Sequence, residues 1–550
     1  YLSGVAKTVW GVAPSDNIVG KRQPAYTGYD LLSDVLNSRI PTIRNYWTVY
    51  DNELRKDVVK SELNIERTTQ ARDLEEKLNE AWEEWIFSNY ERKHELEHIY
   101  NELFNNIRLQ EYDGSYLSFP EMNPAIQLEG YQKNAVARIM KKQSNTLLWQ
   151  GVGAGKTFEM IAAGMEMKRL GLRNKILYVV PNHLIQQWHN DFLTLYPRAH
   201  LLVATKKDFL KDKRQMFINK IATGNYDAII MAHSSFQFLS VSSEYQIEHM
   251  NKEIAVIENA IEQLSYENDK SIRTKRVKIL ERTKKSIEKN VKSLTDIRRD
   301  NNLIPFDKLG IDYMFLDESH EFKNLYTYTA MRNVAGLQTQ HSQKASDMLL
   351  KVKLIEETGG NVCFATGTPV TNTMAELYTI QRYLQEDTLH DMGIYCFDGW
   401  AKVFGKAITS FEISVDGSKF VNRTRFCKFF NIQELMTQIR SIALIQTPGM
   451  LRKDLENSLI GRKEVIPPKH IGGKPQVITI EPSQDLEAYI EDIVERTEAI
   501  HNNSVDSRID NMLKVTSDSK KASIDMRLID PTYPDDDEGK LSIIAKKIVT

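Results

Sequence analysis

A glycine-rich run between a strand-like and a helical segment is the first part of this sequence that could do chemistry. The run spans Gly151–Thr157, follows the apolar residues Leu147–Trp149 and precedes a helical stretch from Phe158 to Leu170. Small residues let backbone amides curve around phosphate oxygens, and the N-terminus of the following helix adds a favourable dipole. The cradle is expected to consist of Gly151, Gly153, Ala154 and Gly155.

Two polar residues, Lys156 and Thr157, close this run. Lys156 is expected to reach the β and γ phosphates as a compact cation, and Thr157 to offer its hydroxyl to Mg²⁺. The strict pattern GxxxxGK[ST] has glycine at position 150, where this chain has Gln150. The alternative is a glycine-rich turn with a chance Lys-Thr pair. The strand-then-helix context favours a P-loop that binds ATP with Mg²⁺.

Two acidic residues directly follow another apolar run. Asp317 and Glu318 come after the segment Asp312–Leu316. Asp317 is expected to hold Mg²⁺, and Glu318 to orient and deprotonate the attacking water. Lys156 and the metal would stabilise the charge that develops on the departing phosphate. An acidic pair after a strand is weak support alone, but with a P-loop on a neighbouring strand it predicts NTP hydrolysis.

The elements that must position these residues are short apolar runs alternating with amphipathic helical stretches. The runs are Thr146–Trp149, Ile176–Val180, Ala228–Met231, Met314–Leu316 and Val362–Ala365. Continuous apolar runs suit buried parallel strands covered by helices on both faces. The sequence therefore predicts an open α/β sheet with ligands at the carboxyl ends of its strands.

The regions outside this pattern are mostly helical. Residues 1–125 are polar, and Thr69–Asn106 lacks Pro and Gly, which favours long helices. Residues 244–299 interrupt the α/β pattern with apolar residues at coiled-coil spacing on an acidic arm and then a basic arm. We predict an antiparallel hairpin. Its basic arm either contacts DNA or pairs with the acidic arm, and the pairing explains the charges without a ligand.

Composition sets broad limits on the protein. A length of 550 residues favours two or three domains, and the formal net charge of -2 neither predicts nor excludes a nucleic-acid partner. The sequence contains no run of about 18 apolar residues, so it does not indicate a membrane span. The three cysteines, Cys363, Cys396 and Cys427, form no CxxC pair, so neither a zinc site nor a disulfide framework is indicated. A cytoplasmic setting fits best. Because the chain starts at Tyr1, we expect a fragment of a longer protein.

With Asp317-Glu318-Ser319-His320 in place, the chain resembles the DExH helicases of superfamily two. Ala365–Pro369 is similar to the third motif of that family. Features of the Snf/Swi-type branch are Tyr131-Gln132, Val179–Trp188, Val370–Tyr378, Met450–Leu455 and Ile466–Lys469. The likeness is greatest to the large methylase-helicase and antirestriction proteins of phages and mobile elements.

The resemblance implies roles for further residues. Gln132 would recognise adenine, and four residues would couple the nucleotide to the DNA grip: His320, Thr366, Gly367 and Thr368. His320 could instead be a buried histidine with satisfied hydrogen bonds. Asn182, His183 and Ser234 lie in segments that contact the DNA backbone in relatives. For Asn182 a helix N-cap is an equally good interpretation.

The resemblance also implies an architecture and a setting. Residues 126–460 would form a first RecA-like ATPase lobe with the hairpin at 244–299 and a helical connection at 380–460. Residues 1–125 would be a helical accessory region, and 461–550 the beginning of a truncated second RecA-like lobe, opening with a strand at 476–480. The partner would be DNA, in duplex form, in the cytoplasm of a bacterial or phage-infected cell.

The sequence is compatible with three functions. The leading one is an ATP-dependent DNA translocase or helicase; the others are a P-loop ATPase acting on RNA or protein, and a non-motor interaction scaffold. The arginine-finger pattern Q-x-x-G-R-x-x-R of the second lobe does not occur, so we expect this chain alone to hydrolyse ATP poorly. Asp530–Tyr533 resembles the D-P-P-Y loop of amino-methyltransferases but lacks the second proline. A methyltransferase domain is therefore expected outside this chain, if there is one.

Overall fold

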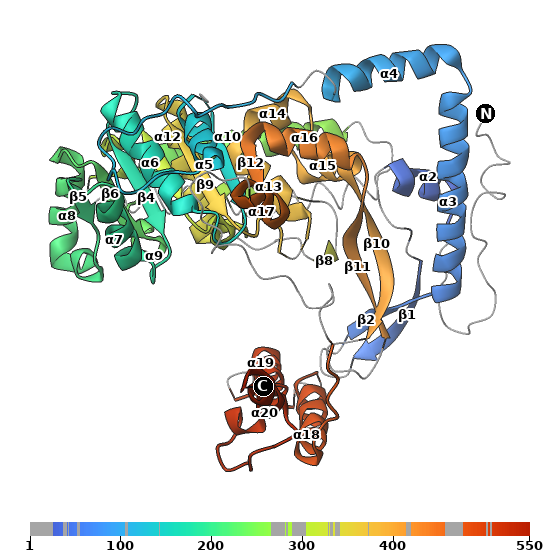
Figure 1. Ribbon diagram of the computed structural model, residues 1–550. Helices are drawn as coiled ribbons and strands as arrows, with labels where there is room; N and C mark the ends of the chain where they lie inside the picture. The colour runs from blue at the N-terminus through green and yellow to red at the C-terminus, as the bar shows by residue number, and fades with distance from the viewer. Residues whose placement is uncertain are drawn as a thin grey trace. The chain divides into compact units, whose positions relative to one another are not determined.

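The fold was obtained as a computed structural model of the chain (Figure 1). The structure describes residues 26–36, 41, 43–51, 56–104, 108–141, 144–265, 281, 284–285, 287–288, 304–327, 329, 334–335, 342–371, 373–413, 420–456, 477–501, 504–506 and 509–549. The chain divides into two units. Unit 1 comprises Tyr1–Ile408 and Phe426–Ile466, and unit 2 comprises Thr409–Arg425 and Pro467–Thr550.

Unit 1 is built around a seven-stranded sheet in which all paired strands are parallel. The strand order is β12-β3-β9-β7-β4-β6-β5. The bounds are β3 Thr146–Gln150, β4 Ile176–Val180, β5 Leu201–Val203, β6 Ala228–Ala232, β7 Tyr313–Leu316, β9 Asn361–Thr366 and β12 Ala443–Gln446. The predicted α/β sheet is confirmed, and each of the five apolar runs forms a strand.

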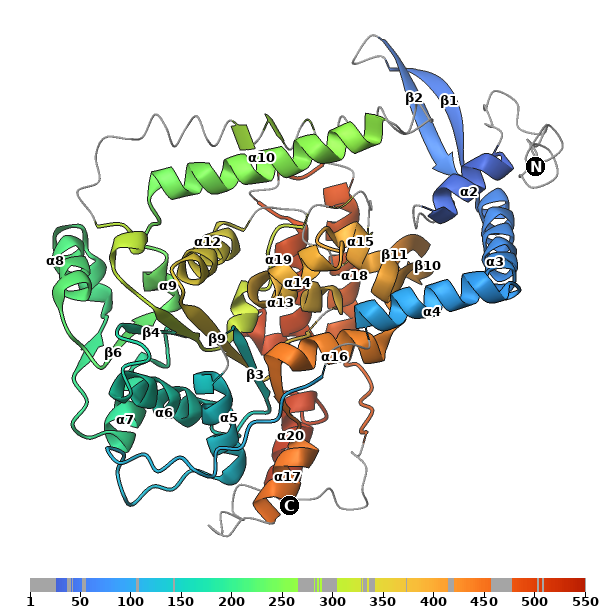
Figure 2. The same ribbon diagram turned by 90° about the horizontal axis from the view of Figure 1, so that it is seen from above.

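Helices cover both faces of this sheet, as Figure 2 shows for α5, α6 and α7 on one face and α9, α12 and α13 on the other. The residues of strand β4 illustrate how the sheet packs against both layers of helices, because alternate side chains belong to different hydrophobic clusters. Ile176, Tyr178 and Val180 pack with the first set of helices, and Leu177 and Val179 with the second. The bounds are α5 Gly130–Lys141, α6 Lys156–Arg169, α7 Ile185–Leu195, α9 His233–Phe236, α12 Gln343–Glu357 and α13 Ala375–Leu384.

Unit 1 contains further elements around the sheet. The helices are α8 Lys211–Thr223, α14 Glu386–Asp391, α15 Phe397–Phe404, α16 Ile432–Ile442 and α17 Pro448–Glu456. Strands β8 Val334–Ala335, β10 Gly405–Ile413 and β11 Phe420–Phe429 form a three-stranded sheet, in which residues 409–413 of β10 and 420–425 of β11 are assigned to unit 2. Strands β10, β11 and β12 thus lie within residues 380–460, where we expected a helical connection.

The first 125 residues combine helices with a hairpin that their composition did not indicate. Helices α3 Ile65–Phe87 and α4 Tyr90–Phe104 confirm the predicted long helices, and α2 Gly28–Leu36 precedes them. Strands β1 Arg44–Asp51 and β2 Lys56–Leu63 pair antiparallel along their whole length. The Asn64 side chain accepts the backbone N–H of Arg67 and so caps α3 where the hairpin ends.

The first arm of the predicted insertion is helix α10, Ser243–Ser265. Most of the second arm lies outside the described residues, so the coiled coil stays a prediction. Lys284 of the second arm forms an ion pair with Glu258 of the first at 2.6 Å. This contact agrees with the interpretation that the basic arm pairs with the acidic one.

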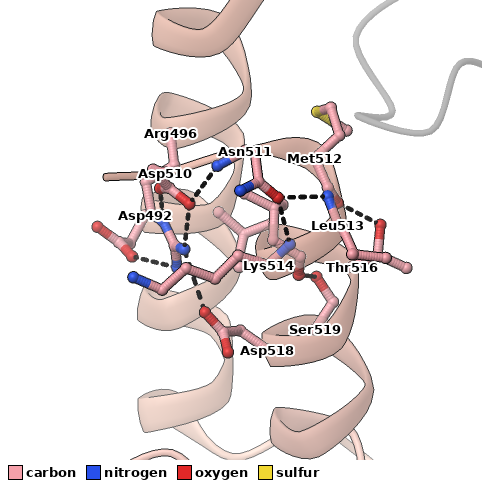
Figure 3. Close-up of polar contacts among 12 residues, drawn as sticks. Asp492, Arg496, Asp510, Asn511, Met512, Leu513, Lys514, Thr516, Asp518 and Ser519 are labelled. Atoms are coloured by element: carbon pink, nitrogen blue, oxygen red, sulfur yellow. Dashed lines mark hydrogen bonds and ion pairs between the residues drawn. The ribbon is translucent and has the colours of Figure 1, made fainter. Parts of the chain in front are cut away.

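Unit 2 contains the helices α18 Gln484–His501, α19 Met512–Ala522 and α20 Lys540–Val549. Figure 3 shows Arg496 of α18 pointing to aspartates on and before α19. Its guanidinium lies 2.7 Å from Asp510 and 3.1 Å from Asp518, and the Asn511 side chain caps α19. The strand expected at 476–480 is not formed in its described part, Val477–Ile480, where Val477 is 88% exposed. The second lobe therefore stays a prediction.

Two smaller expectations concern membranes and cysteines. Among the described residues, no helix combines the length and the apolar character that crossing a membrane requires. Cys363 is buried on β9 and Cys396 is exposed, and both are free thiols. Burial raises the pKa of the Cys363 thiol well above its usual range. Cys363 is therefore an inert core residue.

Candidate nucleotide-binding site

The glycine-rich run forms a tight loop between β3 and α6. Gly153 and Gly155 have φ of 86° and 87°, in the left-handed region that favours glycine. A Cβ on Gly155 would lie 2.3 Å from the Gln132 side-chain amide, so a larger residue would have to displace this amide and would also be strained at this φ. Because Gly155 directly precedes α6, the loop presents the N-terminal amides of that helix, as a phosphate site requires.

Lys156 and Thr157 occupy the first turn of α6. The Lys156 Nζ donates to the carbonyl oxygens of Gln150 at 3.1 Å and Gly151 at 3.3 Å, so the side chain lies over the loop. Both residues are half-buried. The Lys156 ammonium is thus placed over the loop, while the contacts of Lys156 with phosphate and of Thr157 with Mg²⁺ stay predictions.

The acidic pair follows β7 at the same edge of the sheet. Asp317 is 6% exposed, and its Oδ1 accepts the backbone N–H of Glu318 at 2.9 Å. Burial raises the pKa of Asp317 and the Glu318 charge raises it further, whereas Lys156 acts to lower it. Asp317 and Lys156 are therefore within electrostatic range of each other. Glu318 has a φ of 50°, an uncommon conformation for a residue other than glycine.

The loop after β9 lies between these two groups. Strand β9 separates β3 from β7, so our expectation that the two chemistry-bearing strands are neighbours was wrong. Sequence order does not reveal the order of parallel strands, because each crossover helix can carry the chain past an adjacent position. A Cβ on Gly367 would lie 3.5 Å from the Gln150 carbonyl oxygen, so this loop borders the glycine-rich loop.

His320 connects the acidic pair to the loop after β9. Its Nδ1 lies 3.1 Å from Glu318 Oε2 and 3.2 Å from Thr366 Oγ1. Thr366 is buried, and its hydroxyl also accepts the Thr368 backbone N–H at 3.1 Å. The structure thus brings His320, Thr366 and Thr368 together, which is the geometry that the predicted coupling role requires.

Gln132 lies against the glycine-rich loop with its side-chain amide already engaged. Its Nε2 donates to the Ala154 carbonyl oxygen at 3.2 Å, and its Oε1 accepts the Glu129 backbone N–H at 3.0 Å. The Tyr131 hydroxyl donates to the same Ala154 oxygen at 2.8 Å. Gln132 therefore supports the loop in this structure, and its contact with adenine stays a prediction.

The three residues expected to contact DNA are exposed at the carboxyl edge of the sheet. Asn182 and His183 follow β4, and Ser234 lies at the start of α9 after β6. Asn182 Oδ1 accepts the Ser234 hydroxyl at 3.0 Å and its backbone N–H at 3.3 Å. Asn182 does not cap its own helix α7, whose N-cap is Leu184; its side chain accepts a backbone N–H of the first turn of α9 instead.

Three features of the site were not predicted. Helix α17 covers the glycine-rich loop, because Leu451 and Leu455 pack on the fully buried Ala154. Glu159 of α6 is fully buried and accepts a 2.8 Å hydrogen bond from Gln150 Nε2. Trp188 of α7 donates its indole N–H to Asp317. The buried position of Glu159 could have been predicted, because this glutamate occupies an otherwise apolar position of the helix beside the loop.

Mg²⁺ is usually held by one or two protein oxygens together with substrate phosphates and water. The Thr157 hydroxyl and the Asp317 carboxylate are hard oxygen donors of this kind. Among the described residues, no group of three or more His, Cys, Asp or Glu side chains could form an all-protein metal cage. The donor set therefore fits a magnesium ion that arrives with a nucleotide.

A separate cavity lies at the opposite edge of the sheet. It has a volume of about 780 Å³ and is lined by Asn145, Tyr313 and Asn361, which lie at the amino-terminal ends of β3, β7 and β9. The glycine-rich loop and the acidic pair lie at the carboxyl ends of the same sheet. We assign the candidate site by the chemistry of the carboxyl edge, where ligands bind in open α/β sheets.

Parts of the chain are similar to known families and proteins. The sequence profile of a family described as a probable helicase domain matches residues 138–447, and a domain of unknown function, DUF8437, matches residues 3–106. The defense against restriction protein B of Escherichia phage P1 is 23% identical over 375 residues, which cover 60% of this chain and 16% of that protein. This chain thus spans about a sixth of that relative's length.

Among solved structures, the chain matches the SWI2/SNF2 ATPase core of Sulfolobus solfataricus in complex with dsDNA. It is 14% identical to this chain, and the match covers 79% of this chain and 65% of that chain with a TM-score of 0.34.

Proposed function

The chain belongs to the family described as a probable helicase domain, and from this premise we propose that it contains the nucleotide-binding lobe of an ATP-driven DNA motor. Family membership suggests an NTP hydrolase that acts on nucleic acid. The finer parts of the proposal are ATP with Mg²⁺ as the fuel, duplex DNA as the track and translocation as the outcome. The geometry of the carboxyl edge of the sheet supports the first of them, the magnesium nucleotide.

The observation that carries the proposal is the convergence of three strand ends. The glycine-rich loop follows β3, the Thr366–Thr368 loop follows β9, and the acidic pair follows β7, in adjacent order across the sheet. Lys156 influences the pKa of Asp317, and His320 contacts both Glu318 and Thr366. One bound triphosphate would therefore be within reach of all three loops.

The residues divide the chemistry of hydrolysis among them. The loop amides bind the phosphate oxygens, and Lys156 moves from the Gln150 and Gly151 carbonyl oxygens to the β and γ phosphates. Thr157 and Asp317 would hold Mg²⁺, which would supply positive charge to neutralise the phosphates. Glu318 orients the attacking water and accepts its proton, and His320 holds the Glu318 carboxylate in place.

DNA is proposed as the track on two grounds. The exposed Asn182, His183 and Ser234 lie at the carboxyl edge and offer hydrogen-bonding groups suited to phosphate oxygens. The relative from phage P1 is named for defense against restriction, a process that acts on DNA. The alternatives remain an RNA or protein track, and an interaction scaffold with no motor function.

A binding experiment separates these alternatives. Filter binding of residues 1–550 to duplex DNA and to duplex RNA, each with and without a non-hydrolysable ATP analogue and Mg²⁺, should show preference for DNA and dependence on nucleotide. Preference for RNA, or no binding to either, would contradict the proposed track.

The motor and scaffold functions differ in their need for Lys156. Lys156→Ala should weaken nucleotide binding by about a hundredfold, because it removes the cation that contacts two phosphates. Lys168→Ala is the matched control, since Lys168 lies in the last turn of the same helix and donates to Asn174 and Asn225, away from the loop. Equal nucleotide affinity in the two variants would favour the scaffold.

We also propose that residues 1–550 alone turn ATP over slowly. The arginine-finger pattern of the second lobe is absent from these residues, and such arginines raise turnover by about three to five orders of magnitude in NTPases. Steady-state ATPase measurements with DNA test this point. Robust DNA-stimulated turnover by this chain would contradict it.

A further inference from the structure

Asp317 is held by hydrogen bonds from two segments that follow other strands of the sheet. The Trp188 Nε1–H of α7 donates to Asp317 Oδ2 at 3.2 Å. His233, the first residue of α9, places Nε2 2.9 Å from the Asp317 carbonyl oxygen. A carbonyl oxygen only accepts, so Nε2 carries the hydrogen and the tautomer of His233 is defined. Both the carboxylate and the backbone of Asp317 are thus fixed from outside β7.

The two donors are buried and tightly packed. Trp188 is 1% and His233 6% exposed. The Trp188 ring lies 5.7 Å from that of Tyr178, and the His233 ring meets Phe322 edge-on at 5.2 Å. Burial lowers the pKa of His233 to about 4, so its imidazole is neutral near pH 7. Neither side chain can shift without leaving a buried polar group unpaired.

The same two segments carry the exposed residues proposed to contact DNA. Ser234 is the residue after His233, and Asn182 begins the turn that leads into the helix of Trp188. The Asn182 side chain joins the segments by accepting both hydrogen bonds from Ser234. The exposed pair is therefore connected to the buried donors through the backbone and one helical turn.

We propose that Trp188 and His233 are positioning residues that link DNA contact at Asn182 and Ser234 to the orientation of the Asp317 carboxylate. This inference rests on the proposed function, because it takes DNA as one ligand and the magnesium nucleotide as the other. DNA that fixes the exposed pair holds Asp317 in the orientation that ligates the metal. By linkage, the magnesium nucleotide strengthens DNA binding by the same factor.

The experiment measures this coupling factor on residues 1–550. A fluorescent ADP is titrated with Mg²⁺ in the absence and in the presence of a saturating short DNA duplex. Trp188→Phe removes the indole donor and keeps an aromatic ring. The matched control is Trp400→Phe, because Trp400 is equally buried and donates its indole N–H to Gln381 at 2.8 Å, away from the site.

We expect the duplex to raise the affinity of wild-type chain for magnesium-ADP by about tenfold, a typical coupling. Trp400→Phe should retain this factor, and Trp188→Phe should reduce it to near one. Nucleotide affinity without Mg²⁺ should be the same in all three proteins, because the loop amides and Lys156 are unchanged. A structural role alone would lower affinity under every condition and leave the ratio intact.

Substitutions of His233 give an independent test. Gln places an amide N–H where His233 has Nε2–H, so His233→Gln should keep the coupling, whereas His233→Leu should lose it. Coupling in Trp188→Phe or His233→Leu equal to that of wild type would overturn the inference, as would DNA binding by wild type without any coupling. Failure of the wild-type chain to bind DNA would instead overturn the proposed function.

Discussion

The burial of Glu159 predicts how the free energy of unfolding depends on pH, because this acid is fully buried with one polar partner. Gln150 Nε2 donates to its Oε2, and the Oε1 atoms of both residues have no hydrogen-bond partner among the described residues. Burial raises the pKa of Glu159 from 4.5 to about 8, outweighing the opposite effects of Gln150 and Lys156. The carboxyl is therefore protonated in the native protein near neutral pH.

The sign and size of the effect follow from linkage. Above pH 4.5 the unfolded chain releases this proton and the native chain keeps it, so the free energy of unfolding falls with rising pH until the native group ionises near pH 8. The difference of about 3.5 between the two pKa values corresponds to about 5 kcal/mol, at about 1.4 kcal/mol per unit. Most of this loss occurs between about pH 5 and pH 8.

Glu159→Gln should abolish this dependence, because the amide supplies a donor to the buried pair and cannot ionise. Urea unfolding at several pH values should show the variant gaining stability over wild type by about 1.4 kcal/mol per pH unit across this window. Glu166→Gln is the control, since Glu166 is also buried on α6 but is ion-paired with Arg169 at 2.7 Å. A stability difference between wild type and Glu159→Gln that stays constant with pH would refute the argument.

Three further substitutions test other parts of the account. Glu318→Gln should leave magnesium-nucleotide binding within about twofold and slow single-turnover hydrolysis by at least about a hundredfold, since an amide cannot accept the proton of water; an unchanged rate would speak against Glu318 as the base. Gly155→Ala should weaken ATP binding by about tenfold in calorimetry, because φ is 87° and the new Cβ would meet Gln132 at 2.3 Å; unaltered affinity would exclude the strained loop. Arg496→Leu should lower the free energy of unfolding of unit 2 by about 2 kcal/mol in denaturant titrations, because it leaves Asp510 and Asp518 without their cation. An unchanged free energy would show that solvent screens these two ion pairs.

The strands and loops of the site could be predicted because local chemistry determines them. A buried parallel strand must be apolar on both faces, as Ile176–Val180 is, and this pattern is visible in sequence. The glycine-rich loop needs glycine where φ is positive, which restricts residue types at Gly153 and Gly155. The acidic pair follows its strand without an intervening residue, so its place at the sheet edge was evident.

The features that were missed depend on contacts distant in sequence. Strand order is set by how crossover helices pack, so the position of β9 between β3 and β7 was not accessible. The Trp188–Asp317 hydrogen bond joins residues 129 positions apart, and a tryptophan in an amphipathic helix is otherwise an ordinary core residue. The β1–β2 hairpin carries charged residues that resemble those of the helices around it.

The departure of Gln150 from the strict P-loop pattern has a structural explanation. Its side chain is buried and directed to Glu159, while its carbonyl oxygen accepts from Lys156. The glycine of the strict pattern would leave Glu159 without this partner. The pattern alone could not show that a buried acid on the next helix accompanies the substitution.

The central claim is that the loop at 151–157 and the acidic pair at 317–318 share one magnesium nucleotide. An experimental structure of the chain with Mg²⁺ and a non-hydrolysable ATP analogue measures this directly. The account predicts phosphates on the loop amides, Lys156 Nζ on the β and γ phosphate oxygens, and the metal between the Thr157 hydroxyl and Asp317. A nucleotide bound in the cavity at the amino-terminal edge, or a metal remote from Asp317, would contradict it.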